Sequence, residues 1–118
     1  MAKAVGTGRE SAMPEEIAEG EVHIWWACLD GPERTVNGRG DLLSTDEQAR
    51  ARAFHFKRDR DRFVAARSTL RAILAAYTDA SPASLRFRYG EYGKPYLMYP
   101  AGTSCHFSLA HSHERAVY

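Results

Sequence analysis

The sequence predicts one α+β domain, in which a small antiparallel sheet of three to four strands packs against one face of a long helix. Three observations predict this class. The chain has 118 residues and is 44% apolar, which suits one small core and is too short for two domains. Residues 58–78 carry apolar side chains at helical spacing. Residues 22–30, 85–89 and 105–109 form the short apolar or alternating runs typical of strands.

The N-terminal third predicts a tail, a strand and a loop. Residues 1–20 are polar and rich in Gly and Glu, so we expect a flexible tail, and they lack the apolar core of a signal peptide. Residues 22–30 (VHIWWACLD) are apolar on both faces, which favours a fully buried strand with Ile24 and Trp26 in the core. A Gly-Pro pair ends this strand, and a Gly-containing loop follows over residues 31–41.

Two helices follow. Ser44 to Glu47 (STDE) form a capping box, so a first helix should start at Thr45. The longer helix over residues 58–78 has Arg62 and Arg67 on opposite sides of its apolar stripe, where arginine can lay its stem on the core. The stripe contains Phe63, Ala66, Leu70, Ile73, Leu74 and Tyr77.

The C-terminal third predicts short elements. A Ser-Pro pair at 81–82 indicates a turn of helix. Residues 85–89 (LRFRY) and 105–109 (CHFSL) alternate as half-buried strands do, with a turn between them at residues 90–95. Residues 116–118 look like the start of another strand, and because domains rarely end inside a strand, we expect the protein to continue. The expected core also contains Phe87, Phe107 and Leu109.

Charge is concentrated in one block. Residues 50–71 carry 8 basic and 2 acidic side chains, although the net charge of the chain is only +1. Such a block indicates either an anionic partner or an acidic neighbour in the same fold. Asp59 and Asp61 interrupt the run and Phe63 belongs to the core stripe. A localised anion such as a phosphorylated cofactor therefore fits better than a nucleic acid, because arginine grips phosphate well.

Common catalytic signatures are absent from the sequence. It contains no GxSxG, Walker, HExxH or paired-cysteine motif. Cys28 and Cys105 form no metal spacing, which favours reduced thiols and a cytoplasmic location. His111 and His113 could share a metal on one strand face or simply lie exposed at a strand end. Residues 93–95 (GKP) present a lysine from a stiff turn, either to a phosphate or merely as part of a tight turn.

The order of these segments is informative. The chain runs from LLSTDEQARARAF through HFKRDRDRFVAARSTLRAILAAY and SPASLRFRYGEYGKPYL to CHFSLAHSHERAVY. It resembles the N-terminal half of the Sfp-type 4′-phosphopantetheinyl transferases over residues 41–118. The resemblance implies that residues 21–118 form the N-terminal subdomain of a pseudo-twofold α+β fold, with an active site between its two halves.

That family moves phosphopantetheine from coenzyme A to a serine of an acyl or peptidyl carrier protein, in fatty acid, polyketide and nonribosomal peptide biosynthesis. The resemblance implies a coenzyme A site in which Lys94 and Pro95 border the nucleotide. Lys94 and Arg62 would meet phosphates, and His111 would approach the 3′-phosphate or the pyrophosphate. Arg50 matches a position near the 3′-phosphate.

Two positions depart from the family pattern. Glu47 stands where some members carry a lysine, and Ala110 lacks the hydroxyl that many members have there. The acidic segment that holds magnesium in the family, and the later helix that supplies its base, have no counterpart in this sequence.

The resemblance therefore implies part of a transferase of phosphorus-containing groups. We expect this piece to supply part of the coenzyme A site, to contain no catalytic residue or metal ligand, and to be inactive alone. Mg²⁺ is expected only with the C-terminal half, in cis or in trans. The alternatives are a non-catalytic coenzyme A or nucleotide-binding module, a split subunit that needs a partner chain, and a truncated piece that self-associates. A membrane partner is not expected.

Overall fold

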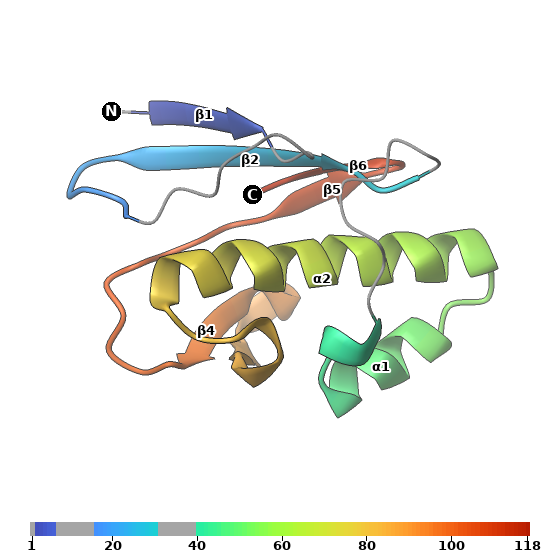
Figure 1. The fold of residues 1–118 in the computed structure, drawn as a ribbon. Coiled ribbons are helices and arrows are strands. Elements are labelled where there is room, and N and C mark those ends of the chain that lie inside the picture. The colour runs from blue at the N-terminus through green and yellow to red at the C-terminus, as the bar shows by residue number, and fades with distance from the viewer. Residues whose placement is uncertain (1, 7–15, 31–39) are drawn as a thin grey trace.

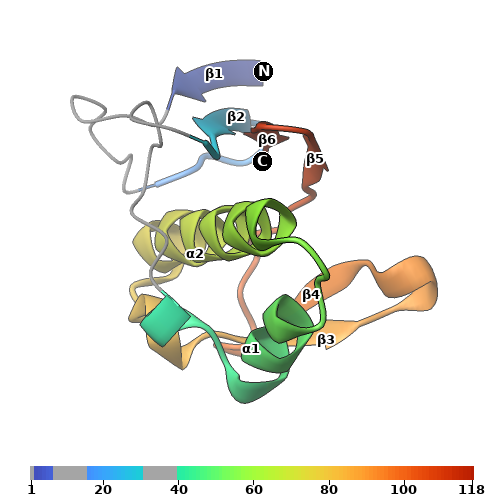
Figure 2. The same cartoon turned by 90° about the vertical axis from the view of Figure 1, so that its right-hand side faces the viewer.

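The computed structural model describes residues 2–6, 16–30 and 40–118. Its elements form three layers, with the long helix α2 (Lys57–Thr78) in the middle (Figure 1). A four-stranded sheet covers one side of α2, and a shorter helix and a β-hairpin lie on the other side (Figures 1 and 2). The predicted α+β class with a long helix across a small, mainly antiparallel sheet is confirmed, and the hairpin adds a second sheet.

The larger sheet has the order β1-β2-β6-β5. β2 pairs with β6 and β6 with β5 in antiparallel fashion, whereas β1 is parallel to β2. The second sheet is the antiparallel pair of β3 and β4. The bounds of the strands are β1 Ala2–Gly6, β2 Val22–Cys28, β3 Arg86–Tyr89, β4 Pro95–Tyr99, β5 Ala110–Ser112 and β6 Arg115–Val117.

The helices begin and end close to their predicted residues. α1 (Thr45–Arg52) starts at the predicted residue, and the backbone N–H of Ser44 donates to Glu47 Oε1 at 3.0 Å, as a capping box requires. The long helix starts one residue before its predicted position. Three short 3₁₀ turns are η1 Gly40–Leu42, η2 Pro82–Ser84 and η3 Glu91–Gly93. Within the described residues, no helix combines the length and apolarity that crossing a bilayer demands.

Strand β2 buries only one of its two faces. Trp25 and Ala27 are buried against α2, while Ile24 and Trp26 are 38% and 46% exposed. The prediction that Ile24 and Trp26 belong to the core is therefore wrong. Side chains alternate along a strand, and α2 covers one side of this sheet, so only every second apolar residue of β2 is covered.

Residues 105–109 also differ from their prediction, because they form no strand. They lie in the segment that leads from the hairpin layer back to the sheet layer (Figure 1), and sheet pairing starts only at Ala110. The inward side chains are nevertheless as expected, since Phe107 and Leu109 pack against the buried cluster of Leu70, Leu74 and Leu85.

The N-terminal tail is partly paired in the structure. The sequence predicts flexibility over residues 1–20, whereas residues 2–6 form the outer strand β1 beside β2. Pairing there satisfies backbone groups that β2 would otherwise leave open at the edge of the sheet. Residues 16–20 lead into β2 as coil and turn. Of the loop predicted over residues 31–41, residues 31–39 lie outside the described residues, and Gly40 and Asp41 belong to a 3₁₀ turn.

Candidate functional site

A buried charge cluster joins helices α1 and α2. Glu47 on α1 is 2% exposed and lies between two buried arginines of α2. Arg71 Nε donates to Glu47 Oε1 at 2.8 Å, and Arg67 Nη1 lies 3.4 Å from Glu47 Oε2. Arg71 Nη1 also donates to the carbonyl oxygens of Pro82 and Leu85, at 2.9 Å each. Glu47 is thus a structural partner of two buried arginines.

Arg62 points the other way, toward the end of the larger sheet. Its Nε and Nη2 donate to the carboxylate of Asp30, which follows β2, at 2.9 and 2.6 Å. This hydrogen bonding raises the pKa of Arg62 above its usual value. The predicted placement of Arg62 and Arg67 on opposite sides of the apolar stripe agrees with these different partners.

The β3–β4 hairpin carries Lys94 and Pro95, and the buried Arg67 of α2 bonds to the hairpin beside its turn. Arg67 Nη1 donates to the hydroxyl of Tyr89 at 3.0 Å, and Tyr89 pairs with Pro95 across the hairpin. The turn is closed by the N–H of Gly90, which donates to the carbonyl of Lys94 at 2.9 Å. The backbone of Lys94 is therefore fixed, while its side chain is exposed.

His111 lies on β5, where it pairs with Ala116 of β6. Its side chain is exposed, as are those of its neighbours Ala110 and Ser112. Figure 2 shows β5 above α2 and the hairpin below it, so the elements that carry His111 and Lys94 lie in the two outer layers, on opposite sides of the helix.

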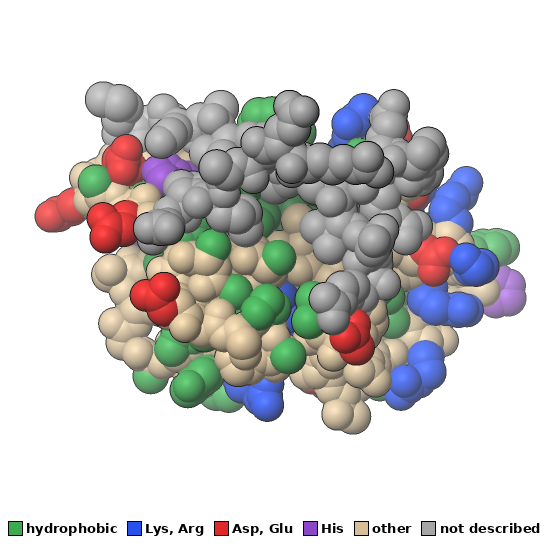
Figure 3. Space-filling model, viewed as in Figure 1, with side chains coloured by type: hydrophobic (Ala, Val, Ile, Leu, Met, Phe, Trp, Pro, Cys, Tyr) green, Lys and Arg blue, Asp and Glu red, His purple; other side chains and the backbone are tan. Residues whose placement is uncertain are grey.

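Arg50 on α1 stacks on the ring of Phe63, with its Cζ 5.3 Å from the ring centroid. Arg67 lies at the same distance from that ring. Arg50 is exposed near the end of α1, close to the connection between α1 and α2. Lys and Arg side chains gather at that end of the molecule in Figure 3. Of the five predicted site residues, Lys94 and Pro95 lie together in the hairpin, His111 lies on β5 in the larger sheet, and Arg62 is bonded to Asp30.

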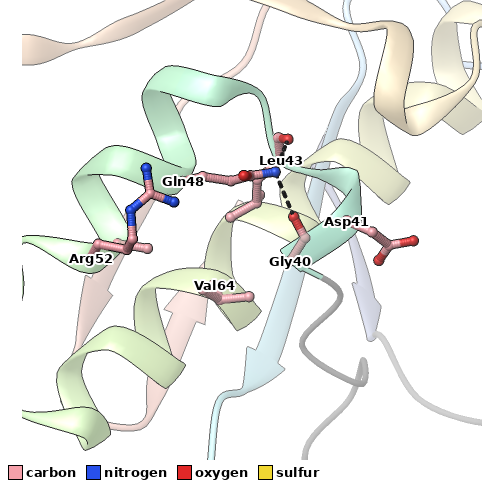
Figure 4. Close-up of a pocket in the computed structure, with 7 residues that line it drawn as sticks. Gly40, Asp41, Leu43, Gln48, Arg52 and Val64 are labelled. Atoms are coloured by element: carbon pink, nitrogen blue, oxygen red, sulfur yellow. Dashed lines mark hydrogen bonds between the residues drawn. The ribbon is translucent and has the colours of Figure 1, made fainter.

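A separate hollow of about 390 Å³ opens beside α1 (Figure 4). Gln48 spans its wall by donating to the carbonyl oxygens of Gly40 and Leu43, at 3.3 and 3.1 Å. None of the five predicted site residues lines it. The lining residues are Gly40, Asp41, Leu43, Gln48, Ala51, Arg52 and Val64.

The described residues give little support for a metal site or for a nucleophilic cysteine. Within residues 2–6, 16–30 and 40–118, no three His, Cys, Asp or Glu side chains cluster closely enough to hold a metal ion. Burial raises the pKa of the Cys105 thiol, which disfavours the thiolate that a nucleophile requires.

Sequence reasoning missed the partners of the buried arginines. Arg67 was expected at one side of the apolar stripe, and no partner was predicted for Arg67 or Arg71. The carboxylate that neutralises both belongs to Glu47, 20 and 24 positions earlier in the chain. Two signals existed, and neither named the partner. The basic block over residues 50–71 indicated an acidic neighbour in the same fold as one of two possibilities, and Glu47 is acidic where the resemblance implies a lysine in some members.

Comparisons with known proteins all point to one family. The family described as 4′-phosphopantetheinyl transferase, N-terminal, matches residues 33–117. The 4′-phosphopantetheinyl transferase HetI of Nostoc sp. is 41% identical over 98 residues, which cover 82% of this chain and 41% of the relative. A putative 4′-phosphopantetheinyl transferase of Synechocystis sp. is 38% identical over 89 residues, covering 75% of this chain and 35% of the relative.

A more distant relative is the 4′-phosphopantetheinyl transferase of Bacillus subtilis, which is 33% identical over 70 residues, or 59% of this chain and 30% of the relative. The chain thus spans less than half the length of these curated relatives. The family match covers most of the described sequence from α1 to β6. This chain belongs to the 4′-phosphopantetheinyl transferase family and corresponds to its N-terminal part.

Proposed function

We propose that this chain supplies the N-terminal part of a coenzyme A site in a 4′-phosphopantetheinyl transferase, which moves phosphopantetheine to a serine of a carrier protein. The observation that carries the proposal is the family match over residues 33–117, within which Lys94 and His111 are exposed basic side chains. In that reaction the serine oxygen bonds to the phosphorus next to pantetheine, and adenosine 3′,5′-bisphosphate leaves.

The chemistry of the exposed groups supports this role. Coenzyme A carries a pyrophosphate and a 3′-phosphate, and the chain offers separate basic groups from α1, the hairpin and β5. Lys94 would bind a phosphate as a point charge from a fixed turn, Pro95 would border the nucleotide, and Arg50 and His111 would approach the phosphates. Nε and Nη2 of Arg62 donate to the carboxylate of Asp30. Its Nη1 would be the donor to a phosphate oxygen.

Among the described residues, the structure shows no group of side chains suited to a magnesium ion. The described part offers no cluster of three acidic or other ligating side chains. Mg²⁺ would neutralise the pyrophosphate as charge develops on the leaving group, and we place its ligands and the base in a C-terminal half supplied in cis or in trans. Residues 1–118 would then bind coenzyme A but not complete the transfer.

Coenzyme A binding tests the first part of the proposal. We expect saturable binding by calorimetry, and a Lys94→Gln variant should bind about tenfold more weakly, because a charge-assisted bond to phosphate is lost. Lys57→Gln is the matched control, since Lys57 is 81% exposed and already pairs with Asp61. A chain that binds no coenzyme A, or a Lys57 variant that loses as much affinity as the Lys94 variant, would contradict this role.

A transfer assay tests the second part. Residues 1–118 are mixed with coenzyme A, Mg²⁺ and an apo carrier protein, and mass spectrometry looks for the added phosphopantetheine. We expect no mass gain from this chain alone and a gain once a C-terminal half is added in trans. Transfer by residues 1–118 alone would show that they complete the catalytic site without a second half.

An exposed apolar face supports a partner for the larger sheet. Val22, Ile24 and Trp26 on β2 and Val117 on β6 are 38–54% exposed, and Trp26 pairs directly with Val117. We propose that the C-terminal half packs on this outer face. Without it, the same face would favour the alternative of a truncated piece that self-associates. Cys28 and Cys105 both stand as thiols in the structure, which fits a cytoplasmic location.

A further inference from the structure

The hollow beside α1 is separate from the residues proposed to bind coenzyme A. Gln48, Ala51 and Arg52 line it from α1, and their spacing of three and four residues places them on one face of the helix. Arg50 is not among the lining residues, because it stacks on the ring of Phe63. The hollow therefore needs an explanation of its own.

An apolar wall gives the hollow a place for an apolar side chain. Leu43 and Ala51 are each 5% exposed, and Val64 packs against the cluster that contains them. Gln48 fastens the wall by donating to the carbonyl oxygens of Gly40 and Leu43 (Figure 4). The volume of about 390 Å³ lies in the range of pockets that take up ligand groups.

Uncompensated arginines border this wall. Arg52 lines the hollow, is exposed, and forms no ion pair with a carboxylate of the described residues. Arg60 comes four residues before Val64, which places both on one side of α2. Its Nε is buried and has no hydrogen-bond partner within the described part of the chain, which is costly for a donor. Asp41 turns its carboxylate away from Arg52 (Figure 4). An anion bound beside the hollow would therefore be favoured.

The surplus of positive charge continues to the start of α2. Residues 52–60 carry four basic side chains and one acidic one. Lys57 pairs with Asp61, whereas Arg58 is exposed and has no ion pair among the residues that the structure describes. Figure 3 shows the Lys and Arg side chains gathered at this end of the molecule. A ligand that contacts these cations and also enters the hollow must be extended.

We propose that the hollow and its arginines are a docking site for an acidic peptide segment of a partner protein. An apolar side chain of the segment would enter the hollow against Leu43 and Val64, and carboxylates on either side of it would bind Arg52 and Arg58. Charge complementarity selects an acidic ligand. A nucleic acid supplies anions but no aliphatic side chain for the hollow, so a protein segment fits better. The site does not depend on the proposed coenzyme A site.

Fluorescence anisotropy with labelled peptides tests the site on residues 1–118. One peptide has a leucine between two runs of glutamate, a second has serine in place of the leucine, and a third has lysine in place of the glutamates. The leucine–glutamate peptide should bind about tenfold more tightly than the serine peptide, because its apolar side chain leaves water. The lysine peptide should not bind, and added salt should weaken binding of both glutamate peptides.

Three variants separate the contributions of charge and shape. Arg52→Gln should weaken binding of both glutamate peptides about fivefold, because a charge-assisted contact is lost. Val64→Thr keeps the shape of the side chain but brings a hydroxyl to the apolar wall. It should weaken binding of the leucine peptide about threefold and leave the serine peptide unaffected. Arg88→Gln is the matched control, since Arg88 is an exposed arginine on the hairpin, and it should change neither affinity. Circular dichroism checks that each variant is folded.

Equal affinities for the leucine and serine peptides would show that no side chain enters the hollow. Equal losses for Arg52→Gln and Arg88→Gln would show that the charge contact is unspecific, and either result would overturn the proposal. Displacement of the bound peptide by coenzyme A or by a single-stranded oligonucleotide would also overturn it, because the surface would then belong to a nucleotide or a nucleic acid. Peptide binding with the expected variant effects, in a chain that binds no coenzyme A, would support the docking site and contradict only the proposed function.

Discussion

Glu47 shows how one side chain can serve three elements. Its carboxylate receives the backbone N–H of Ser44 at the start of α1 and the guanidinium of Arg71 from α2. Arg71 in turn holds the carbonyl oxygens of Pro82 and Leu85 ahead of β3. A buried arginine without its carboxylate would keep the full desolvation penalty of its charge. The negative charge of Glu47 is thus required by its surroundings.

Replacing Glu47 tests this dependence. Glu47→Gln should lower the free energy of unfolding by about 3 kcal/mol, because two buried arginines lose their counter-charge while side-chain size is retained. Urea titration followed by circular dichroism measures the change. Asp61→Asn is the matched control, since it removes a carboxylate from the exposed pair with Lys57 and should cost less than about 0.5 kcal/mol. A Glu47 variant as stable as the control would show that the cluster contributes no net stability.

At the level of single residues, the sequence predicted local relations better than distant ones. The capping bond between Ser44 and Glu47 was predictable because both residues lie within one helical turn. The contact of Arg88 and Lys94 with the ring of Tyr96 was not, since it depends on the strand register, which a run of alternating residues leaves open. The roles of Arg50, Arg62, Lys94, Pro95 and His111 in binding coenzyme A stay predictions until affinities are measured.

Among the elements, helices were predicted more closely than strands. The apolar stripe of α2 is long enough to fix its period, so both ends agree with the prediction within one residue. β2 has apolar residues on both faces, and a sequence of this kind does not tell which face a helix will cover. For residues 105–109 the alternation was correctly interpreted as inward and outward side chains, but a strand also needs a neighbour to pair with, and α2 is their neighbour there.

The packing of β6 against α2 has a pH dependence that can be measured. Tyr118 follows β6, and its hydroxyl donates to the carbonyl of Ala66 on α2 at 2.6 Å. Burial raises the pKa of Tyr118 above the usual value of 10.0. The unfolded chain therefore loses this proton at a lower pH than the folded chain does. Below pH 10.0 the group contributes its full stability, and above it the stability falls as pH rises.

Tyr118→Phe should change this profile in two ways. At neutral pH the variant should be less stable by about 1 kcal/mol, because the hydrogen bond from the Tyr118 hydroxyl to the carbonyl of Ala66 is lost. Above pH 10.0 its stability should fall less steeply than that of the unmodified chain. Urea titrations between pH 7 and about pH 11 measure both effects. Tyr99→Phe, which removes an exposed hydroxyl on β4, should follow the unmodified profile, and equal slopes for all three chains would contradict the assignment.

For the whole molecule, the two sides of the larger sheet have different roles. The inner side buries Trp25 and Ala27 against α2 and holds the core together. The outer side carries exposed apolar residues on β2 and β6, including Trp26 and Val117, which pair across the strands. Single exposed apolar side chains are common on protein surfaces, but a contiguous group on paired strands favours association. The family match supports a partner, because its members extend well beyond the length of this chain.

The outer face predicts how residues 1–118 behave when no partner is present. Copies of the chain should associate through this face at micromolar concentrations, since covering Trp26 and Ile24 removes apolar surface from water. Sedimentation velocity should show a concentration-dependent shift toward dimers. The double variant Ile24→Thr and Trp26→Thr keeps strand-forming residues and should sediment as a monomer with an unchanged circular dichroism spectrum.

Tyr99→Thr gives the matched control, because Tyr99 is 53% exposed on the hairpin, away from the larger sheet. This variant should associate as the unmodified chain does. If the unmodified chain is monomeric at all concentrations, or if Tyr99→Thr abolishes association while the double variant does not, the outer face of the sheet is not the association surface. If the double variant remains monomeric and also fails to complement a C-terminal half in the transfer assay, the same face serves both contacts, because a single apolar surface then accounts for self-association and for assembly of the active enzyme.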